Sequence, residues 1–327
     1  MPRLVRRLEF LLVTFWAAVS INFLLPRMMP GDPVQALMNR MKGQIDPRAR
    51  HSLEIMLGVN VDKPLWQQYI DYWGQVLRFD FGASITYFPD AVDHVIATAI
   101  PWTLGLVGTT LIIAFTLGTV LGALAAWRRG GVLDSVLPPV FIVVGGLPFF
   151  WVGLLFIYVF SIWLGIFPIG FGYDVTQELT FSWEVVSQIL LHAILPATVI
   201  VLTSIGGWML TMRNTMIGVL NEDYIKMARA KGLSTWRIMV QYAGRNAILP
   251  NLTGFAMSLG FVISGALLTE LVFTYPGVGY QFVQAVTGQD YPLMQALFLL
   301  VTTATLLAVV ISDGIIYLLD PRTRGRS

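Results

Sequence analysis

Six long apolar blocks, separated by polar stretches, constrain this sequence more than any other feature. Each holds about 20 residues or more, which is the length a helix needs to cross a hydrocarbon core of about 30 Å. Of the 327 residues, 56% are hydrophobic and 12% are charged, about half the charge of an ordinary soluble domain. The sequence therefore predicts an all-α membrane protein with six transmembrane helices. The blocks are Leu8–Leu25, Trp102–Ala126, Val136–Leu164, Ile189–Leu210, Leu252–Phe273 and Leu293–Leu319.

Basic residues gather in alternate connections between these blocks. The loops 165–188 and 274–292 contain no Lys or Arg, whereas the N-terminus, the loop at 128–129, the stretch around 213–245 and the C-terminus are basic. Because cytoplasmic loops carry the excess of Lys and Arg, both termini are predicted to be cytoplasmic. The formal net charge of +2 gives no case for a nucleic-acid partner.

The domain organisation follows from the same pattern. Residues 1–28 are predicted to form the cytoplasmic N-terminus and a retained first transmembrane helix; a cleaved signal peptide is the alternative. Residues 29–100 are polar and rich in proline and aromatic residues, and they predict a helical extracytoplasmic subdomain that serves as a membrane-surface cap or as a platform for a soluble partner. Residues 101–320 are predicted to form a five-helix core with a cytoplasmic loop at 211–250, and residues 321–327 a cytoplasmic tail. An amphipathic helix is expected through Leu65, Tyr69, Tyr72, Trp73 and Val76.

The stretch 221–250 is the longest charged segment between two apolar blocks. Asn221 is a suitable N-cap, acidic residues follow in the first turn, and basic residues come later, an order that suits the helix dipole. Gly232 occupies the place of a left-handed C′ residue, and Ser234 can cap a second helix. The pattern predicts a short helix, a glycine turn and a second helix, which is a unit suited to docking on a soluble protein.

Catalytic signatures are scarce. The sequence has no phosphate-binding G-x-x-x-x-G-K-[ST] loop, no H-E-x-x-H motif and no cysteine, and its three histidines are scattered. No catalytic residue and no metal site are predicted. Glu270 and Asp313 lie in or near late apolar blocks, where a carboxylate must face protein or water. Each is interpreted either as a substrate-pathway or gating contact, or as a structural hydrogen bond or ion pair with a neighbouring loop. The glycine pairs 145–146 and 206–207 predict close helix packing or kinking. Pro138, Pro139 and Pro148 predict that the third block is kinked or begins after a surface segment.

Motifs along nearly the whole chain resemble the permease subunits of binding-protein-dependent ABC importers, in the dipeptide/oligopeptide/nickel branch. Lys226 and Met227 replace the Glu and Ala of the general importer pattern, and the spacing from Gly232 to Pro250 is longer than in sugar importers; both departures are typical of this branch. The matching motifs are Pro30-Gly-Asp-Pro33, Pro64-Leu-Trp-x-Gln-Tyr69, Phe79-Asp-Phe-Gly-x-Ser84, Phe167-Pro-Ile-x-x-Gly172, Asp223-Tyr-x-x-x-Ala-Arg-Ala-Lys-Gly-Leu233, Arg245-Asn-Ala-x-Leu-Pro250, Tyr275-Pro-Gly-x-Gly279, Asp290-Tyr-Pro292 and Leu319-Asp-Pro-Arg322.

The resemblance implies a type I ABC importer fold in the bacterial or archaeal inner membrane, with both termini inside. It implies a homologous permease partner, two ATP-binding subunits that hold ATP and Mg, and an extracytoplasmic solute-binding protein; no cofactor is expected in this chain. Tyr275, Pro276 and Gly277 join Glu270 and Asp313 as candidates for the pathway or gate. The stretch 223–250 resembles the EAA loop, whose coupling helix docks on the ATPase, and the residues expected there are Asp223, Tyr224, Lys226, Ala228, Arg229, Ala230, Lys231 and Gly232.

Other functions make different demands on the sequence. A secondary transporter should show inverted repeats or midplane ionisable clusters, and neither is recognisable. An intramembrane enzyme needs a reactive constellation, and a scaffold would not explain the capped charged helix. Within the importer class, peptides are expected first, then oligosaccharides, with nickel third and glutathione also a substrate of the branch.

Overall fold

A computed structural model describes residues 2–28, 63–174, 176, 182–262 and 267–319. Regular structure in these ranges is helical, apart from one bridge between Ala83 and Ala91. The chain forms two compact units: the first holds the described residues of Met1–Thr103, Ile263–Leu267 and Pro276–Leu306, and the second holds the described remainder. The predictions for 29–62, which include the Pro30–Pro33 motif, and for the 321–327 tail lie outside the described residues.

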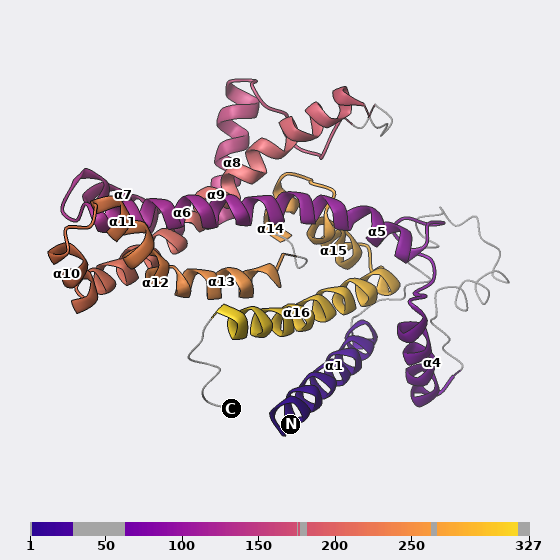
Figure 1. Ribbon diagram of the computed structural model, residues 1–327. Helices are drawn as coiled ribbons and strands as arrows, with labels where there is room; N and C mark the ends of the chain where they lie inside the picture. Colours follow the sequence, from indigo (N-terminus) through magenta and orange to yellow (C-terminus); the bar gives the residue numbers. More distant parts are fainter. Residues whose placement is uncertain (1, 29–62, 175, 177–181, 263–266, 320–327) are drawn as a thin grey trace. The chain divides into compact units, whose positions relative to one another are not determined.

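The first unit contains the amphipathic helix that the aromatic spacing predicts. Tyr72 and Val76 are buried, and Tyr69 and Trp73 are half-buried against α1, whereas Leu65 is exposed and does not belong to the packed face. Leu65 begins the helix, where no neighbour covers it. The helices of this unit are α1 (Pro2–Met28), α4 (Leu65–Arg78), α5 (Val92–Thr103), α15 (Val278–Thr287) and the first part of α16 (Tyr291–Leu319), shown in Figure 1.

Polar contacts join α4 to α1 in addition to the aromatic packing. The buried Asn22 donates hydrogen bonds to the Tyr72 hydroxyl at 2.9 Å and to the Gln295 carbonyl at 2.7 Å. Phe23 meets Tyr69 edge to face with ring centroids 5.2 Å apart. Because buried polar groups are costly unless they are paired, these contacts fix the register of α4 on α1.

The second unit is built on the parallel neighbours α6 and α9, which lie side by side (Figure 1). A Cβ added to Gly118 would lie 2.6 Å from Trp208 Cβ, and one added to Gly122 would lie 2.9 Å from Met212 Cβ. The two glycines therefore allow the backbones to approach closely. The elements of this unit are η1 (Leu104–Gly108), α6 (Thr109–Trp127), α7 (Val132–Gly146), α8 (Phe149–Phe156), η2 (Ile157–Trp163), α9 (Trp183–Leu220), α10 (Asp223–Ala230), α11 (Thr235–Arg237), η3 (Ile238–Gly244), α12 (Arg245–Ala247), α13 (Leu249–Leu259), α14 (Leu267–Val272) and the last part of α16, with η1, η2 and η3 being π-helical.

Several helices are long and apolar enough to cross a membrane. They are Val92–Trp127, Trp183–Leu220 and Tyr291–Ser312, with the bent pair α7 and α8–η2 as a fourth candidate and Glu9–Leu25 as a shorter apolar helix. The pair bends by 94° between Gly146 and Phe149, so Pro148 produces the predicted break. Pro138 and Pro139 lie inside α7 and do not end it.

The helix limits differ from the apolar blocks at two places. The helix of the second block begins at Val92, before Trp102, and α9 extends to Leu220, well past the expected end at Leu210. In both cases the helix continues beyond the apolar block into a more polar stretch of sequence. Leu252–Phe273 is not one helix in the described residues, because α13 ends at Leu259 and α14 begins at Leu267.

Candidate functional site

The helix predicted between Asn221 and Gly232 is α10. Its N-cap is Glu222, and Asn221 is instead the C-cap of α9, so the expected N-cap role of Asn221 is wrong. The reason is that α9 continues to Leu220, so Asn221 is the residue that ends α9 and not the one that begins α10. Lys226 donates to Asp223 at 2.8 Å on the exposed side of α10, where an ion pair contributes little to stability.

Gly232 ends α10 as the sequence predicts. Its φ is +71°, in the left-handed region. The Gly232 N–H donates to the Arg229 carbonyl at 2.9 Å, and the Leu233 N–H donates to the Ala228 carbonyl at 3.3 Å. This pair of bonds is the Schellman motif, which satisfies the last carbonyls of the helix and turns the chain sharply toward α11.

One face of α10 is anchored in the core of the second unit. Ile225 is fully buried and Ala228 is 3% exposed, and both pack in one cluster with residues of α9, η3 and α12. α10 is thus held by its own chain along this face. Ala228 lies on the inner side, so its methyl group contacts this chain rather than open solvent. The buried members of the cluster are Ala126, Met212, Met216, Ile225, Ala228, Ile238, Met239, Ala243 and Ala247.

The other face of α10 presents apolar and basic side chains to solvent. Met227 is 61% exposed and Tyr224 is 39% exposed, while the neighbouring Trp236 of α11 is 69% exposed. The Tyr224 hydroxyl accepts a hydrogen bond of 2.9 Å from Asn246, which ties α10 to α12. The predicted residues Asp223, Lys226, Arg229, Ala230, Lys231 and Gly232 are also exposed.

Met227 and Trp236 are functional candidates that the sequence did not single out. Large apolar side chains exposed beside charged ones are typical of protein interfaces. The sequence features that could have identified them are the position of Met227, three residues after Tyr224, and the presence of the tryptophan Trp236 in an otherwise polar stretch. We call Tyr224, Met227 and Trp236, with the exposed basic residues of α10, the outer face of α10.

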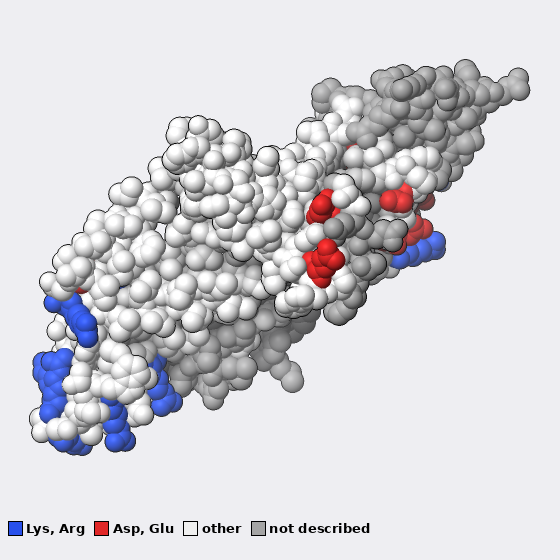
Figure 2. Space-filling model, turned by 90° about the horizontal axis from the view of Figure 1, so that it is seen from above, with Lys and Arg blue, Asp and Glu red and all other residues white. Residues whose placement is uncertain are grey.

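Basic residues surround this outer face. Figure 2 shows a group of Lys and Arg atoms on the face in view, and the basic side chains of α10 and of the segments before and after it are exposed. Arg213 is different, since its Nε donates to Asp134 at 2.5 Å and its side chain is largely buried. Asp134 also accepts the Gly130 N–H at 2.9 Å, so Arg213 anchors the 128–134 turn on α9. The exposed basic residues are Arg128, Arg129, Lys226, Arg229, Lys231, Arg237 and Arg245.

A buried polar joint fixes α13, which follows this region, to the α6–α9 pair. Asn251 is 1% exposed, and its Nδ2 donates to Thr119 Oγ1 at 2.9 Å and to the Trp208 carbonyl at 3.0 Å. The Asn251 amide of α13 therefore binds a side chain of α6 and a backbone carbonyl of α9. These hydrogen bonds hold α13 in place on the α6–α9 pair.

The structure describes four of the five residues predicted to belong to a pathway or gate. Glu270 and Tyr275 are buried in the second unit, where the Tyr275 N–H donates to the Glu270 carbonyl at 2.8 Å. In the first unit, Gly277 is the N-cap of α15 and Pro276 precedes it. The side chain of Asp313 lies outside the described residues. A pathway or gating role for these five residues stays a prediction.

A metal centre is not recognisable in the ranges that the structure describes, where no group of three or more His, Asp or Glu side chains converges. The polar residues described above bind one another and the backbone. Among these described residues, no nucleophile with an adjacent base stands out.

Comparison with known proteins gives one consistent family. Residues 118–325 match the family described as binding-protein-dependent transport system inner membrane component. The chain is 35% identical to the di/tripeptide transport system permease protein DppB of Pseudomonas aeruginosa, covering 98% of this chain and 97% of that protein. It is 32% identical to the dipeptide transport system permease protein DppB of Escherichia coli (99% and 98% covered) and 32% identical to the oligopeptide transport system permease protein AppB of Bacillus subtilis (92% of each).

Proposed function

The chain belongs to the family of inner membrane components of binding-protein-dependent transport systems, and from this premise we propose that it is a permease subunit of an ATP-driven importer of di- and oligopeptides. The membrane location and the permease class follow from the family. The peptide substrate rests on the names of the three relatives, all of which are peptide or oligopeptide permeases.

The observation that carries the proposal is the two-sided construction of α10. Its inner face is buried on α9, η3 and α12, and its outer face exposes Tyr224, Met227 and basic side chains. A helix anchored in this way moves together with the elements it packs on. Docked on an ATP-binding subunit, α10 would pass that subunit's closure to α9 and, through Asn251, to α6 and α13.

The length of α9 supports the same assignment. At 1.5 Å per residue its 38 residues extend over about 57 Å, whereas a hydrocarbon core is about 30 Å thick. The part of α9 that follows the apolar block, from Leu210 to Leu220, would therefore project from the bilayer and hold α10 clear of the lipid surface. With the N- and C-termini inside and six spans, this projection lies in the cytoplasm, where ATP-binding subunits are found.

In the assembly that follows from this proposal, the chain has four kinds of partner. The chain would pair with a homologous permease to form the path, and two ATP-binding subunits would carry ATP and Mg. An extracytoplasmic solute-binding protein would deliver the peptide, and lipid would cover the apolar faces of the spans. This chain would supply no catalytic residue, because hydrolysis takes place on the ATP-binding subunits.

Reconstituted uptake tests the proposal. The tagged full chain, purified with the subunits that accompany it, is placed in vesicles with the solute-binding protein and a radiolabelled dipeptide. Uptake that requires ATP and saturates with peptide supports the proposal. Uptake that follows an ion gradient and ignores ATP contradicts it and indicates a secondary transporter. Uptake of oligosaccharides or nickel in place of peptides contradicts the substrate.

A further inference from the structure

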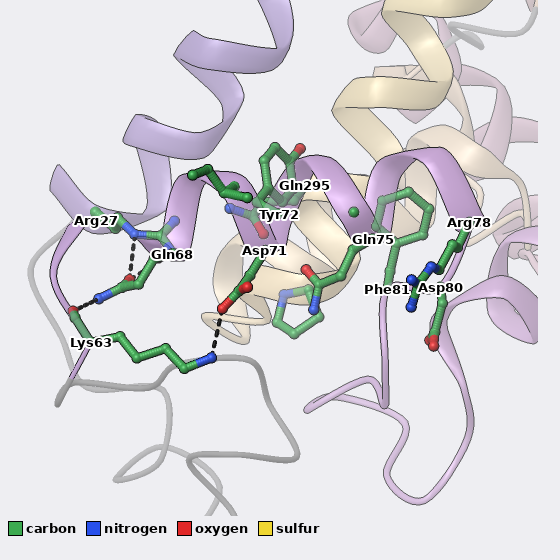
Figure 3. Close-up of a pocket in the computed structure, with 13 residues that line it drawn as sticks. Arg27, Lys63, Gln68, Asp71, Tyr72, Gln75, Arg78, Asp80, Phe81 and Gln295 are labelled. Atoms are coloured by element: carbon green, nitrogen blue, oxygen red, sulfur yellow. Dashed lines mark hydrogen bonds and ion pairs between the residues drawn. The ribbon is translucent and has the colours of Figure 1, made fainter. Parts of the chain in front are cut away.

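A polar pocket of about 490 Å³ lies in the first unit, along one side of α4. It falls in the range of small-ligand sites, which is about 300–1,000 Å³. In Figure 3, Arg78 and Asp80 lie toward one end of the pocket, and Arg27, Gln68 and Lys63 lie toward the other. The lining also includes Asp71, Tyr72, Gly74, Gln75 and Gln295.

Some of these polar side chains form hydrogen bonds or ion pairs with one another. Arg27 lies over the Phe23 ring at 3.6 Å and donates to Gln68 Oε1 at 3.0 and 3.2 Å. Lys63 forms an ion pair with Asp71 Oδ2 at 2.7 Å. These contacts shape one end of the pocket and leave the second oxygen of Asp71 available.

Other groups have no protein partner for their side chains. Within the part of the chain that the structure describes, neither Gln75 nor Arg78 forms a side-chain hydrogen bond or ion pair, and Asp80 accepts one hydrogen bond, from the Gly82 N–H at 3.2 Å. Asp71, Gln75 and Arg78 stand at i, i+4 and i+7, which places them along one face of α4. The Cα atoms of Asp71 and Arg78 are about 10 Å apart at 1.5 Å per residue.

The charges on this face of α4 indicate which class of ligand the pocket would bind. The lining carries charges of both signs, Asp71 and Asp80 together with Arg27, Lys63 and Arg78, and this suits a zwitterionic ligand better than an ion of one sign. A short peptide has an ammonium group at one end, an amide in the middle and a carboxylate at the other end. These groups complement, in the same order, the Asp71 carboxylate, the Gln75 amide and the Arg78 guanidinium. A di- or tripeptide extends over about 7–10 Å, which fits this spacing.

We propose that this pocket is a binding site for short peptides with free termini, on the extracytoplasmic side of the permease. Arg78 binds the peptide carboxylate, Gln75 bonds the peptide amide, and Asp71 binds the ammonium group. The inference rests on the proposed function for its peptide substrate and its side of the membrane. It adds a contact between the permease itself and the peptide, outside the membrane spans.

Photocrosslinking tests this site directly. Washed membrane vesicles that contain the full chain and its accompanying subunits are illuminated with a dipeptide of alanine and diazirine-bearing leucine. Crosslinks are expected within residues 63–81, and excess dialanine should compete whereas dialanine blocked at both termini should not. Arg78→Gln should reduce this labelling about tenfold, the scale of one lost charge-assisted hydrogen bond. The exposed α5 residue Asp93 lies outside the pocket, and Asp93→Asn is the matched charge control.

Gly74 offers a second pair of variants that changes no charge. A Cβ added there meets no atom within 4 Å, because the position faces the open pocket. Gly74→Phe should fill the pocket and abolish labelling, and Gly74→Ala should retain it. Crosslinks that map elsewhere, or full labelling in both Arg78→Gln and Gly74→Phe, would overturn the site. ATP-dependent uptake is measured separately, so loss of the pocket and loss of the importer function are distinguishable.

Discussion

The hydroxyl of Ser84 donates a hydrogen bond of 2.5 Å to Asp290, although the two residues are 206 positions apart. Asp290 is fully buried, and its carboxylate also accepts the Thr86 N–H at 2.8 Å and the Leu293 N–H at 3.1 Å. One side chain therefore holds the loop before α5 and caps the first turn of α16. A buried carboxylate requires such donors, because its desolvation is otherwise uncompensated.

Removal of this carboxylate should destabilise the first unit. Asp290→Ala leaves three buried donors without their acceptor and should lower the free energy of unfolding by about 1–3 kcal/mol; Ser84→Ala should cost about 1 kcal/mol. Thermal unfolding of the purified protein measures both. The neighbouring Asp90 is exposed, so Asp90→Ala is the control. Equal midpoints for Asp290→Ala and Asp90→Ala would contradict this role.

Sequence and structure agree where the signal is local. Gly232 adopts the left-handed conformation, Pro148 breaks the third block, and the aromatic spacing of α4 marks its buried side. These features depend on a few neighbouring residues and on elementary backbone geometry. The family, too, is recognisable from short motifs spread along the chain.

Features that depend on distant partners could not be predicted. The Ser84 and Asp290 motifs were both recognised, but no local rule states that they meet. Of the glycines expected at close packing, Gly206 faces Phe141 Cβ at 2.9 Å, whereas Gly146 and Gly207 meet no atom within 4 Å. Asn221 was assigned to the wrong helix end because tertiary support, not propensity, extends α9 to Leu220.

Close packing of α6 on α9 gives a second prediction. Gly122→Ala places a methyl group against the Met209 carbonyl and Met212 Cβ, so the helices must separate. Overpacking of this kind costs about 1–3 kcal/mol. Gly207→Ala, on α9 with open space around it, should be neutral or stabilising, because alanine favours a helix over glycine. Thermal unfolding in one detergent compares them, and a Gly122→Ala variant as stable as Gly207→Ala would refute the packing argument.

The buried hydroxyl of Tyr72 gives a pH dependence. Burial raises its pKa to about 12, although the Asn22 hydrogen bond and the Arg27 charge act to lower it. The ordinary pKa is about 10, so the neutral hydroxyl contributes stability that is present below about pH 10 and lost as pH rises to about 12. The loss should approach 1.4 kcal/mol per pH unit in that window.

Unfolding at pH 8 and at about pH 11 checks this expectation. The wild-type protein should lose more stability between these two values than Tyr72→Phe, which has no proton to release there. Tyr158 is exposed, so Tyr158→Phe should lose as much as the wild type. The same alkaline loss in Tyr72→Phe as in the wild type would show that another group is responsible.

Substitution of Gly232 should be harmful because of its backbone conformation and not because of steric crowding. A Cβ at this position meets no atom within 4 Å, but φ of +71° costs other residues about 1–2 kcal/mol. Gly232→Val and Gly232→Trp should therefore reorient α10 and uncouple ATP hydrolysis from uptake while membrane insertion persists. Asparagine tolerates this conformation, so Gly232→Asn should retain more uptake. Wild-type uptake in Gly232→Trp would contradict the prediction.

Contact between α10 and an ATP-binding subunit is the central claim, and single cysteines test it most directly. The chain contains no cysteine, so Met227→Cys and Ala228→Cys each introduce one unique thiol, exposed in the first variant and buried in the second. The complex recovered with each tagged variant is treated with a short thiol-to-lysine crosslinker. The account predicts that Met227→Cys links to an ATP-binding subunit and that Ala228→Cys does not. An assembled complex in which Met227→Cys forms no such link would contradict it.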